Sequence, residues 1–395
     1  MKPHVHFFGG QGIGWALDED LERARAAVAG EVVAGSFAAS PIIHSAWWPP
    51  LLQAGAVALR GKSILCFADN PPAFYLTRPG FEEAAARVDL WIARSREAVA
   101  QFEELGLPVV RAPYTVDPGI FCPLPAGERA GIRQKLGLSD GDFVVGNFHR
   151  DSLEKNLARS KAQKGPDVFV EIVERARREI PSLKVLLAGP RRHWLRGELA
   201  RRNLPFVFAG KTLSTDDFSV NVLSRRELNR LYSALDCVLI SSRWEGGPYS
   251  VLESLFAGRP VISTPVGMAA DLLDGWLYTS PQEGADLLVA MASGRVDFSP
   301  LRAKALTSHS AATLGECLVA AYKKFSGTRE PAARQAGALW NLGLRRIFRG
   351  VREPLGCHPH VADIMNHVRR KQAEPGSLAA RAIEIANAET EAQIP

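Results

Sequence analysis

The chain has 395 residues, a length that suits two compact domains better than one. Hydrophobic residues make up 46% of it and charged residues 23%, and no apolar run approaches the roughly 18 residues of a membrane span, so we expect a soluble globular protein. The net charge of +6 favours anionic partners, which include phosphorylated metabolites, nucleic acid and anionic membrane surfaces.

The N-terminal sequence lacks the layout of a secretory signal, and the five cysteines are scattered and odd in number. We therefore expect a cytoplasmic protein with reduced thiols.

The first 120 residues alternate short apolar runs with helical patterns. Helices are expected near 19–29 and 96–105, and strands within HVHFFGG, PIIHSAW, SILCFAD, LWIARS and PVVRAPY. This alternation predicts a Rossmann-like domain over 1–125. The segment 112–127 is rich in proline and glycine, which indicates a linker.

Residues 135–325 repeat the alternation more clearly. The runs DFVVGNF, LKVLLAG, PFVFAG, DCVLISS and RPVIST are apolar throughout, as in parallel strands covered on both faces. Ser224 and Glu227 form a capping box for one of the intervening helices. The fold class predicted is α/β, with two doubly wound domains facing a cleft and a helical C-terminal extension over 326–395.

The segment SSRWEGGPYSVLE joins a strand to a short helix. Ligands of doubly wound sheets bind beyond the carboxyl ends of the strands, where helix N-termini present free N–H groups. Gly246 and Gly247 leave such amides uncovered, and Glu253 lies about five residues into the helix. Glu245 and Glu253 are too far apart to share a proton, but they can bind two separate polyol groups of one ligand, as in a nucleotide sugar.

Two basic residues follow the first strand of this domain. Arg150 comes after the strand, and Lys164 precedes a helix that begins near Pro166. A lysine at a helix N-terminus is slightly unfavourable, because its positive charge opposes the helix dipole. An anion such as a diphosphate, bound between the lysine and the helix end, would make the interaction favourable.

Residues 142–325 resemble the nucleotide-sugar-binding domain of the retaining GT-B glycosyltransferases, especially glycosyltransferase family 4. The resemblance is carried by EGGPYSVLE, which matches that family's pair of glutamates with seven residues between them, and by QKGPDVFVEIV and LKVLLAGP. In all, the resemblance covers roughly residues 88–325, with weaker support before residue 88. The resemblance implies the GT-B fold and transfer of a hexose, with retention, from a nucleotide-diphosphate sugar to a carbohydrate or lipid-linked acceptor, in cell-surface polysaccharide or glycolipid synthesis.

The same resemblance implies the catalytic residues. Arg150 and Lys164 would clamp the donor diphosphate, and Glu245 would contact the transferred sugar. The family usually places its arginine and lysine about half a dozen residues apart, but fourteen positions separate them here. Arg159 and Lys161 are therefore alternative members of the clamp.

Further binding residues follow from the resemblance. Glu253 would hold the ribose hydroxyls. The other expected donor contacts are Gly246, Gly247, Pro248, Tyr249, Gly189 and Gly12. On the acceptor side, the family often has a histidine after an N-terminal strand; the comparable place here has Asp69 and Asn70, and His44 is the alternative.

Three other features point to no second activity. GGQGIG (9–14) has Trp15 where a dinucleotide motif requires its third small residue. Cys357, His358, His360 and His367 do not match zinc spacing. The sequence also shows no evident acidic pair at a strand end that could carry a metal, so we expect metal-independent transfer without a cofactor. The segment 338–352 mixes arginines with aromatic residues, which suits a solvated helix or a peripheral membrane contact. No nucleic-acid-binding module is recognised.

Two alternative functions stay open at this stage. One is a nucleotide-sugar epimerase or hydrolase of the same fold. The other is a catalytically silent GT-B carbohydrate-binding protein, which the replacement of the family's histidine by Asp69 and Asn70 keeps open.

Overall fold

The computed structural model describes residues 2–326 except 11, 13–15, 76, 77, 79, 155, 295 and 296. It separates into two compact units. Unit 1 is Met1–Thr115 together with 309–326 of the described chain, and unit 2 is Val116–Ser308. The division between Thr115 and Val116 falls within the proline- and glycine-rich segment 112–127.

Unit 1 contains a parallel sheet in the order β2-β1-β3-β4-β5-β6. Its elements are β1 (His4–Phe8), α1 (Ala16–Ala27), β2 (Val33–Ala34), β3 (Ile42–Ser45), α2 (Pro49–Leu59), β4 (Ser63–Ala68), a 3-10 turn (Pro72–Phe74), α3 (Phe81–Ala85), β5 (Leu90–Ala93), α4 (Arg96–Glu104), β6 (Val109–Arg111) and α13 (Ala311–Phe325). The order reverses between β1 and β3, which defines the switch point of a doubly wound sheet.

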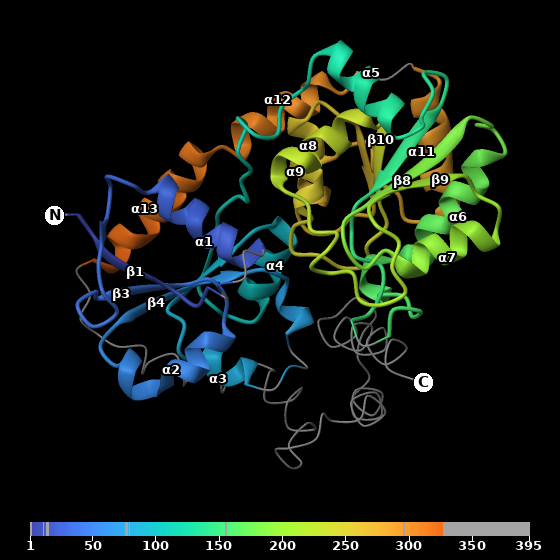
Figure 1. The fold of residues 1–395 in the computed structure, drawn as a ribbon. Helices are drawn as coiled ribbons and strands as arrows, with labels where there is room; N and C mark the ends of the chain where they lie inside the picture. Colours follow the sequence, from blue (N-terminus) through green and yellow to red (C-terminus); the bar gives the residue numbers. More distant parts are fainter. Residues whose placement is uncertain are drawn as a thin grey trace. The chain divides into compact units, whose positions relative to one another are not determined.

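Helices cover both faces of this sheet. α1 and α13 lie on one face, and α2 and α3 lie on the other (Figure 1). Each face buries its own apolar cluster, because successive strand residues point to opposite sides.

Helix α13 follows unit 2 in the chain but packs in unit 1. A Cβ added to Gly315 would lie 2.4 Å from the carbonyl oxygen of Ala27, so only glycine lets α13 approach α1 this closely. Tyr322 is buried and forms a hydrogen bond with the ring of His44 on β3. The expected C-terminal domain, 135–325, included this helix; the structure instead groups it with unit 1, because its apolar face completes the first sheet's core.

Unit 2 contains a parallel sheet in the order β11-β10-β7-β8-β9. Its elements are α5 (Ala126–Lys135), β7 (Phe143–Asn147), a 3-10 turn (Ala162–Lys164), α6 (Pro166–Arg177), β8 (Leu183–Ala188), α7 (His193–Arg201), β9 (Phe206–Ala209), α8 (Arg225–Ala234), β10 (Cys237–Ile240), α9 (Tyr249–Phe256), β11 (Val261–Ser263), α10 (Met268–Leu272), α11 (Pro281–Ala292) and α12 (Ser299–Ser308). α6 and α7 lie on one side of the sheet and α8 and α9 on the other (Figure 1). The switch point lies between β7 and β10.

The predicted α/β fold class is confirmed. Every strand expected from an apolar run is present, and the capping box of Ser224 and Glu227 forms at the start of α8. Gly258 follows α9 with a φ of 74°, the left-handed conformation that ends a helix. The two-residue strand β2 was not predicted, because it is too short to give a periodic signal.

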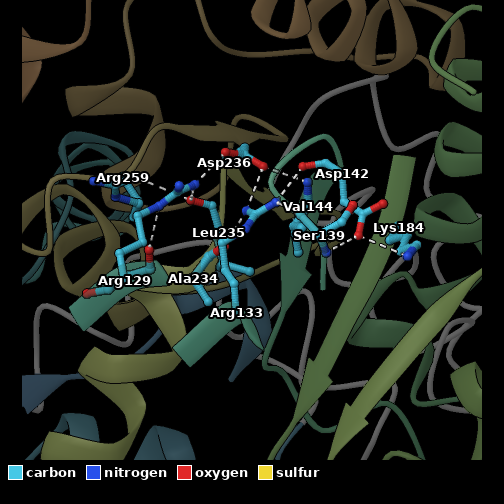
Figure 2. A network of polar contacts seen from close by, with 11 residues as sticks. Arg129, Arg133, Ser139, Asp142, Val144, Lys184, Ala234, Leu235, Asp236 and Arg259 are labelled. Atoms are coloured by element: carbon cyan, nitrogen blue, oxygen red, sulfur yellow. Dashed lines mark hydrogen bonds and ion pairs between the residues drawn. The ribbon is translucent and has the colours of Figure 1, made fainter. Parts of the chain in front are cut away.

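A polar network fixes α5 to the amino-terminal edge of the second sheet (Figure 2). The carboxylate of Asp236, directly before β10, accepts from Arg129 at 2.7 Å, from Arg133 at 3.2 Å and from the amide of Val144 at 2.8 Å. Arg133, only 1% exposed, also donates to the Ala234 carbonyl at 2.9 Å, near the end of α8. The network thus joins α5, α8, β7 and β10 at the edge opposite the strands' carboxyl ends.

Some predictions fall on other parts of the chain. The C-terminal extension, the segment 338–352 and the residues Cys357, His358, His360 and His367 lie outside the described residues. Across the described part of the chain, no helix has both the length and the apolar character needed to span a membrane.

Candidate active site

The candidate site lies in unit 2, at the carboxyl ends of β7 and β10. These strands are neighbours in the sheet, but the chain leaves them toward opposite sides. Ligand sites of doubly wound sheets occur at such a switch point, because the two following loops diverge there. The loops are 148–165 after β7 and 241–248 after β10.

The two loops are held together at the turn before α6. Gly165 has a φ of 54°, and an added Cβ would lie 1.9 Å from the carbonyl oxygen of Ser241. The Ser241 hydroxyl donates to the carbonyl of Lys164 at 3.1 Å, and the Arg243 amide donates to the carbonyl of Gln163 at 2.8 Å. Lys164 is therefore fixed beside the end of β10.

Lys164 and Glu245 form an ion pair across these loops. Oε1 of Glu245 also accepts from the Ser242 hydroxyl at 2.9 Å, whereas Oε2 has no hydrogen-bond partner among the described residues. Burial alone would raise the pKa of Glu245, but the charge of Lys164 together with His149 and Ser242 lowers it, so the carboxylate stays ionised. In this structure the anion beside Lys164 is therefore the carboxylate of Glu245, whose contacts are made through Oε1.

The glycine turn presents backbone donors. The N–H groups of Gly246 and Gly247 donate to no other residue in the described chain, and they precede α9, which begins at Tyr249 with Pro248 as its N-cap. A Cβ at Gly267 would lie 2.4 Å from the Gly246 carbonyl, so glycine at position 267 lets its backbone pack against this turn. Unsatisfied N–H groups at a helix N-terminus form a site for an anion or a sugar oxygen.

Glu253 lies in α9, 8% exposed, with its orientation fixed by Tyr232. The Tyr232 hydroxyl donates to Oε2 of Glu253 at 2.8 Å, and the Tyr232 ring lies 5.0 Å from that of Phe148, just after β7. Burial and the negative charge of Glu253 raise the pKa of Tyr232, so it remains a hydrogen-bond donor. Tyr232 was not among the predicted residues, since its position in α8 gives no sequence signal for this contact.

Arg150 follows β7 and stacks on an aromatic ring. Its guanidinium lies 6.0 Å from the ring centre of Phe218, and that of Arg191 lies 4.9 Å from the same ring. Burial, and then the charge of Arg191, lower the pKa of Arg150. Arg191 is paired with Asp216 at 2.7 Å and with Glu154 at 3.1 Å.

The long spacing between Arg150 and Lys164 has a structural explanation. The Lys161 amide donates to the Asp151 carbonyl at 2.6 Å, and Ser152 and Ser160 form an antiparallel bridge. The described residues of the segment 152–160 therefore form an excursion that is closed at its base. Its closure brings the backbone of Lys161 to Asp151, the residue that follows Arg150.

His149 is a site residue that the sequence did not indicate. Its Nε2 forms a hydrogen bond with the Ser250 hydroxyl of α9 at 2.8 Å. Burial, and then the charge of Lys164, lower the pKa of His149 to about 3, so the ring is neutral. A histidine beside Arg150 in a loop has no spacing that distinguishes it from a surface residue.

Gly189 lies at the carboxyl end of β8, the same edge of the sheet, with a φ of 84°. Among the described residues, no group of three or more His, Cys, Asp or Glu side chains is arranged to hold a metal ion.

The remaining candidates lie in unit 1. His44 is 0% exposed, with its ring 4.1 Å from that of Phe67, so it belongs to the core beneath α13 and has no access to an acceptor in this structure. Asp69 and Asn70 follow β4 at the carboxyl edge, where the Tyr75 hydroxyl donates to Asp69. Burial raises the pKa of Asp69.

Gly12 lies in the loop after β1, at the switch point of unit 1. Its amide donates to the carboxylate of Asp18, in the first turn of α1, at 3.1 Å, so this expected donor contact already has a partner.

Comparison with known proteins agrees with this architecture. Residues 156–293 match the family model described as Glycosyl transferases group 1. The chain is similar to the crystal structure of Anabaena HepE in complex with UDP-glucose, at a TM-score of 0.60 and 17% identity over 81% of this chain and 99% of that one. It is also similar to the trehalose-6-phosphate synthase OtsA, at a TM-score of 0.52 and 16% identity over 72% and 71% of the two chains.

The fold is GT-B.

A curated relative is the D-inositol 3-phosphate glycosyltransferase of Mycobacterium sp. (strain KMS), 26% identical over 268 residues. That alignment covers 67% of this chain and 51% of the relative, so the chain spans about half the length of the curated relative it matches.

The family match coincides with most of the site in unit 2. Its 156–293 range includes Lys164, Gly189, Glu245 and Glu253, and it begins after Arg150. In this GT-B chain, Arg150 is therefore assigned to the candidate site from the structure and not from the family match. The contact that supports the assignment is the hydrogen bond from Lys161 to Asp151, which closes the excursion.

Proposed function

We propose that the protein is a retaining glycosyltransferase that moves a hexose from a nucleotide-diphosphate sugar to a carbohydrate or lipid-linked acceptor. The observation that carries the proposal is the convergence, at the switch point of unit 2, of basic side chains, two unpaired glycine amides and an ionised glutamate with one open oxygen. The group 1 family match over the same segment supports it, and so does the binding of UDP-glucose by HepE, which has the same fold.

Each site residue has a role in this proposal. Arg150 and Lys164 stabilise the charge that develops on the departing diphosphate, together with the Gly246 and Gly247 amides. Oε2 of Glu245 accepts from a hydroxyl of the transferred hexose.

At the other end of the donor, Glu253, held by Tyr232, accepts from the ribose hydroxyls. Pro248 and Tyr249 shape the turn that faces the donor, and Gly189 borders it at the end of β8. On the acceptor side, Asp69 and Asn70 are the candidates at the carboxyl edge of unit 1.

The proposal includes transfer without a metal, because side-chain cations and amides can take up the diphosphate charge. Addition of EDTA is then expected to leave the rate unchanged. We further propose a cytoplasmic location, a peripheral membrane contact through 338–352 and a role in cell-surface polysaccharide or glycolipid synthesis.

The proposal is tested by incubating the protein with UDP-, GDP- and ADP-hexoses and a panel of free and lipid-linked sugars. We expect a product whose new bond has the donor's anomeric configuration, read by NMR. Lys164→Ala and Glu253→Ala should each lower kcat/KM by at least about 100-fold, because each removes a charged contact to the donor. Lys135→Ala, which removes an exposed lysine of α5, is the matched control and should retain full activity.

Other outcomes identify the alternatives. Conversion of the donor without any acceptor would indicate an epimerase or hydrolase, and donor binding without turnover would indicate a silent binding protein. Full activity of both site variants would refute the site.

A further inference from the structure

Lys161 lies at the closing end of the excursion that separates Arg150 from Lys164. Its backbone amide is fixed to the Asp151 carbonyl at 2.6 Å, and its own carbonyl accepts from the Lys164 amide at 2.8 Å. The backbone therefore places Lys161 between the two expected members of the clamp. Its side chain is partly buried.

The ammonium of Lys161 has no ion-pair or hydrogen-bond partner among the described residues. Lys164, by contrast, is paired with Glu245. The charged groups that act on Lys161 are Lys164, Arg150, Glu245 and Arg191. Lys161 in turn acts on His149, whose ring is neutral. Arg191 is itself paired with Asp216 and Glu154. The like charges of Lys164 and Arg150 each act on Lys161 more strongly than the opposite charge of Glu245 does.

Burial, and then the like charges of Lys164 and Arg150, lower the pKa of Lys161 to about 8. A partly buried ammonium beside other cations is unfavourable in the empty protein unless a bound anion compensates it. A diphosphate carries several negative charges and can contact several cations at once. The arrangement is thus costly without the ligand and favourable with it.

We propose that Lys161 is a third ligand of the donor diphosphate, placed there by the closed excursion of residues 152–160. This inference rests on the proposed donor site. It explains why the excursion does not weaken the clamp: its closing residue adds a cation between Arg150 and Lys164.

A role of Lys161 in donor binding makes the affinity for the donor depend on pH. Above pH 8 the empty site has lost the Lys161 proton, and the diphosphate must restore it on binding. Affinity for a nucleoside diphosphate is therefore full below about pH 8 and falls as the pH rises, by up to about tenfold per pH unit.

The test is calorimetric titration of the full-length protein with UDP, GDP and ADP, and with the matching monophosphates, between pH 7.5 and 9.5. Lys161→Met should weaken binding of the diphosphate by about tenfold or more and affect the monophosphate much less, because one charge-assisted contact is lost. Lys161→Arg should retain the affinity and remove the decline above pH 8, since arginine stays charged. Lys135→Ala again serves as the control.

A second measurement separates binding from folding. If Lys161 binds the ligand, Lys161→Met should melt at or above the wild-type temperature without ligand, because an uncompensated cation is removed. Diphosphate affinity within twofold of wild type in Lys161→Met, with an unchanged pH profile, would overturn the inference but leave the donor site intact. Failure of the wild type to bind any of the three diphosphates would overturn both.

Discussion

Gly165 connects the basic turn of the candidate site to the second sheet. Its φ of 54° lies in the left-handed region, and the space where a Cβ would stand is taken by the Ser241 carbonyl, 1.9 Å away. That contact is with backbone, which cannot rotate aside. A single hydrogen atom as the side chain is therefore what lets Lys164 approach Glu245.

Gly165→Ala should destabilise the protein by more than about 2 kcal/mol, because strain at φ and a backbone clash both oppose folding. Gly197→Ala is the matched control: Gly197 lies inside α7 with nothing near its Cβ position, so the change should stabilise by about 0.5–1 kcal/mol. Urea unfolding of the two variants measures both values. Equal stabilities for the two would contradict the close approach of the loops.

At the scale of elements, α5 is joined to the sheet through charge as well as apolar contacts. Arg129 and Arg133 both reach Asp236, and Arg133 adds donations to the carbonyls of Ala234, at 2.9 Å, and Asp142, at 2.6 Å (Figure 2). The Ala234 carbonyl belongs to the last turn of α8, where the helix dipole favours a positive charge. The first helix after the linker is thereby fixed to the strands that carry the candidate site at their other end.

Replacing Arg133 with methionine should cost roughly 3 kcal/mol of unfolding free energy, because the carbonyls of Ala234 and Asp142 lose a donor and Asp236 loses one of its three. Lys135→Ala, two residues further along the same helix and exposed, should change stability by less than about 0.5 kcal/mol. Chemical denaturation of both variants is the measurement. A small loss for Arg133→Met would mean that apolar packing alone holds α5.

At the scale of the whole molecule, the strands could be predicted from the sequence, and so could the positions of Glu245 in the turn after β10 and of Glu253 in the helix that follows. Buried parallel strands read as continuous apolar runs, and the glutamates lie in one short segment with a fixed spacing. Contacts between distant segments could not be read in this way. The placement of α13 in unit 1 depends on a close approach at Gly315, and the position of Lys161 depends on backbone closure at Asp151.

In the proposed function, unit 2 holds a nucleotide sugar between its basic turn and Glu253. A thermal-unfolding panel of nucleotide sugars tests it most directly, since a ligand at about 100 times its Kd stabilises the native state by about 2.7 kcal/mol. We expect donors of one nucleotide to raise the Tm of the wild type, and Lys164→Ala and Glu253→Ala to lose that rise relative to their own ligand-free Tm. No rise with any donor, or equal rises in both variants, would contradict the account.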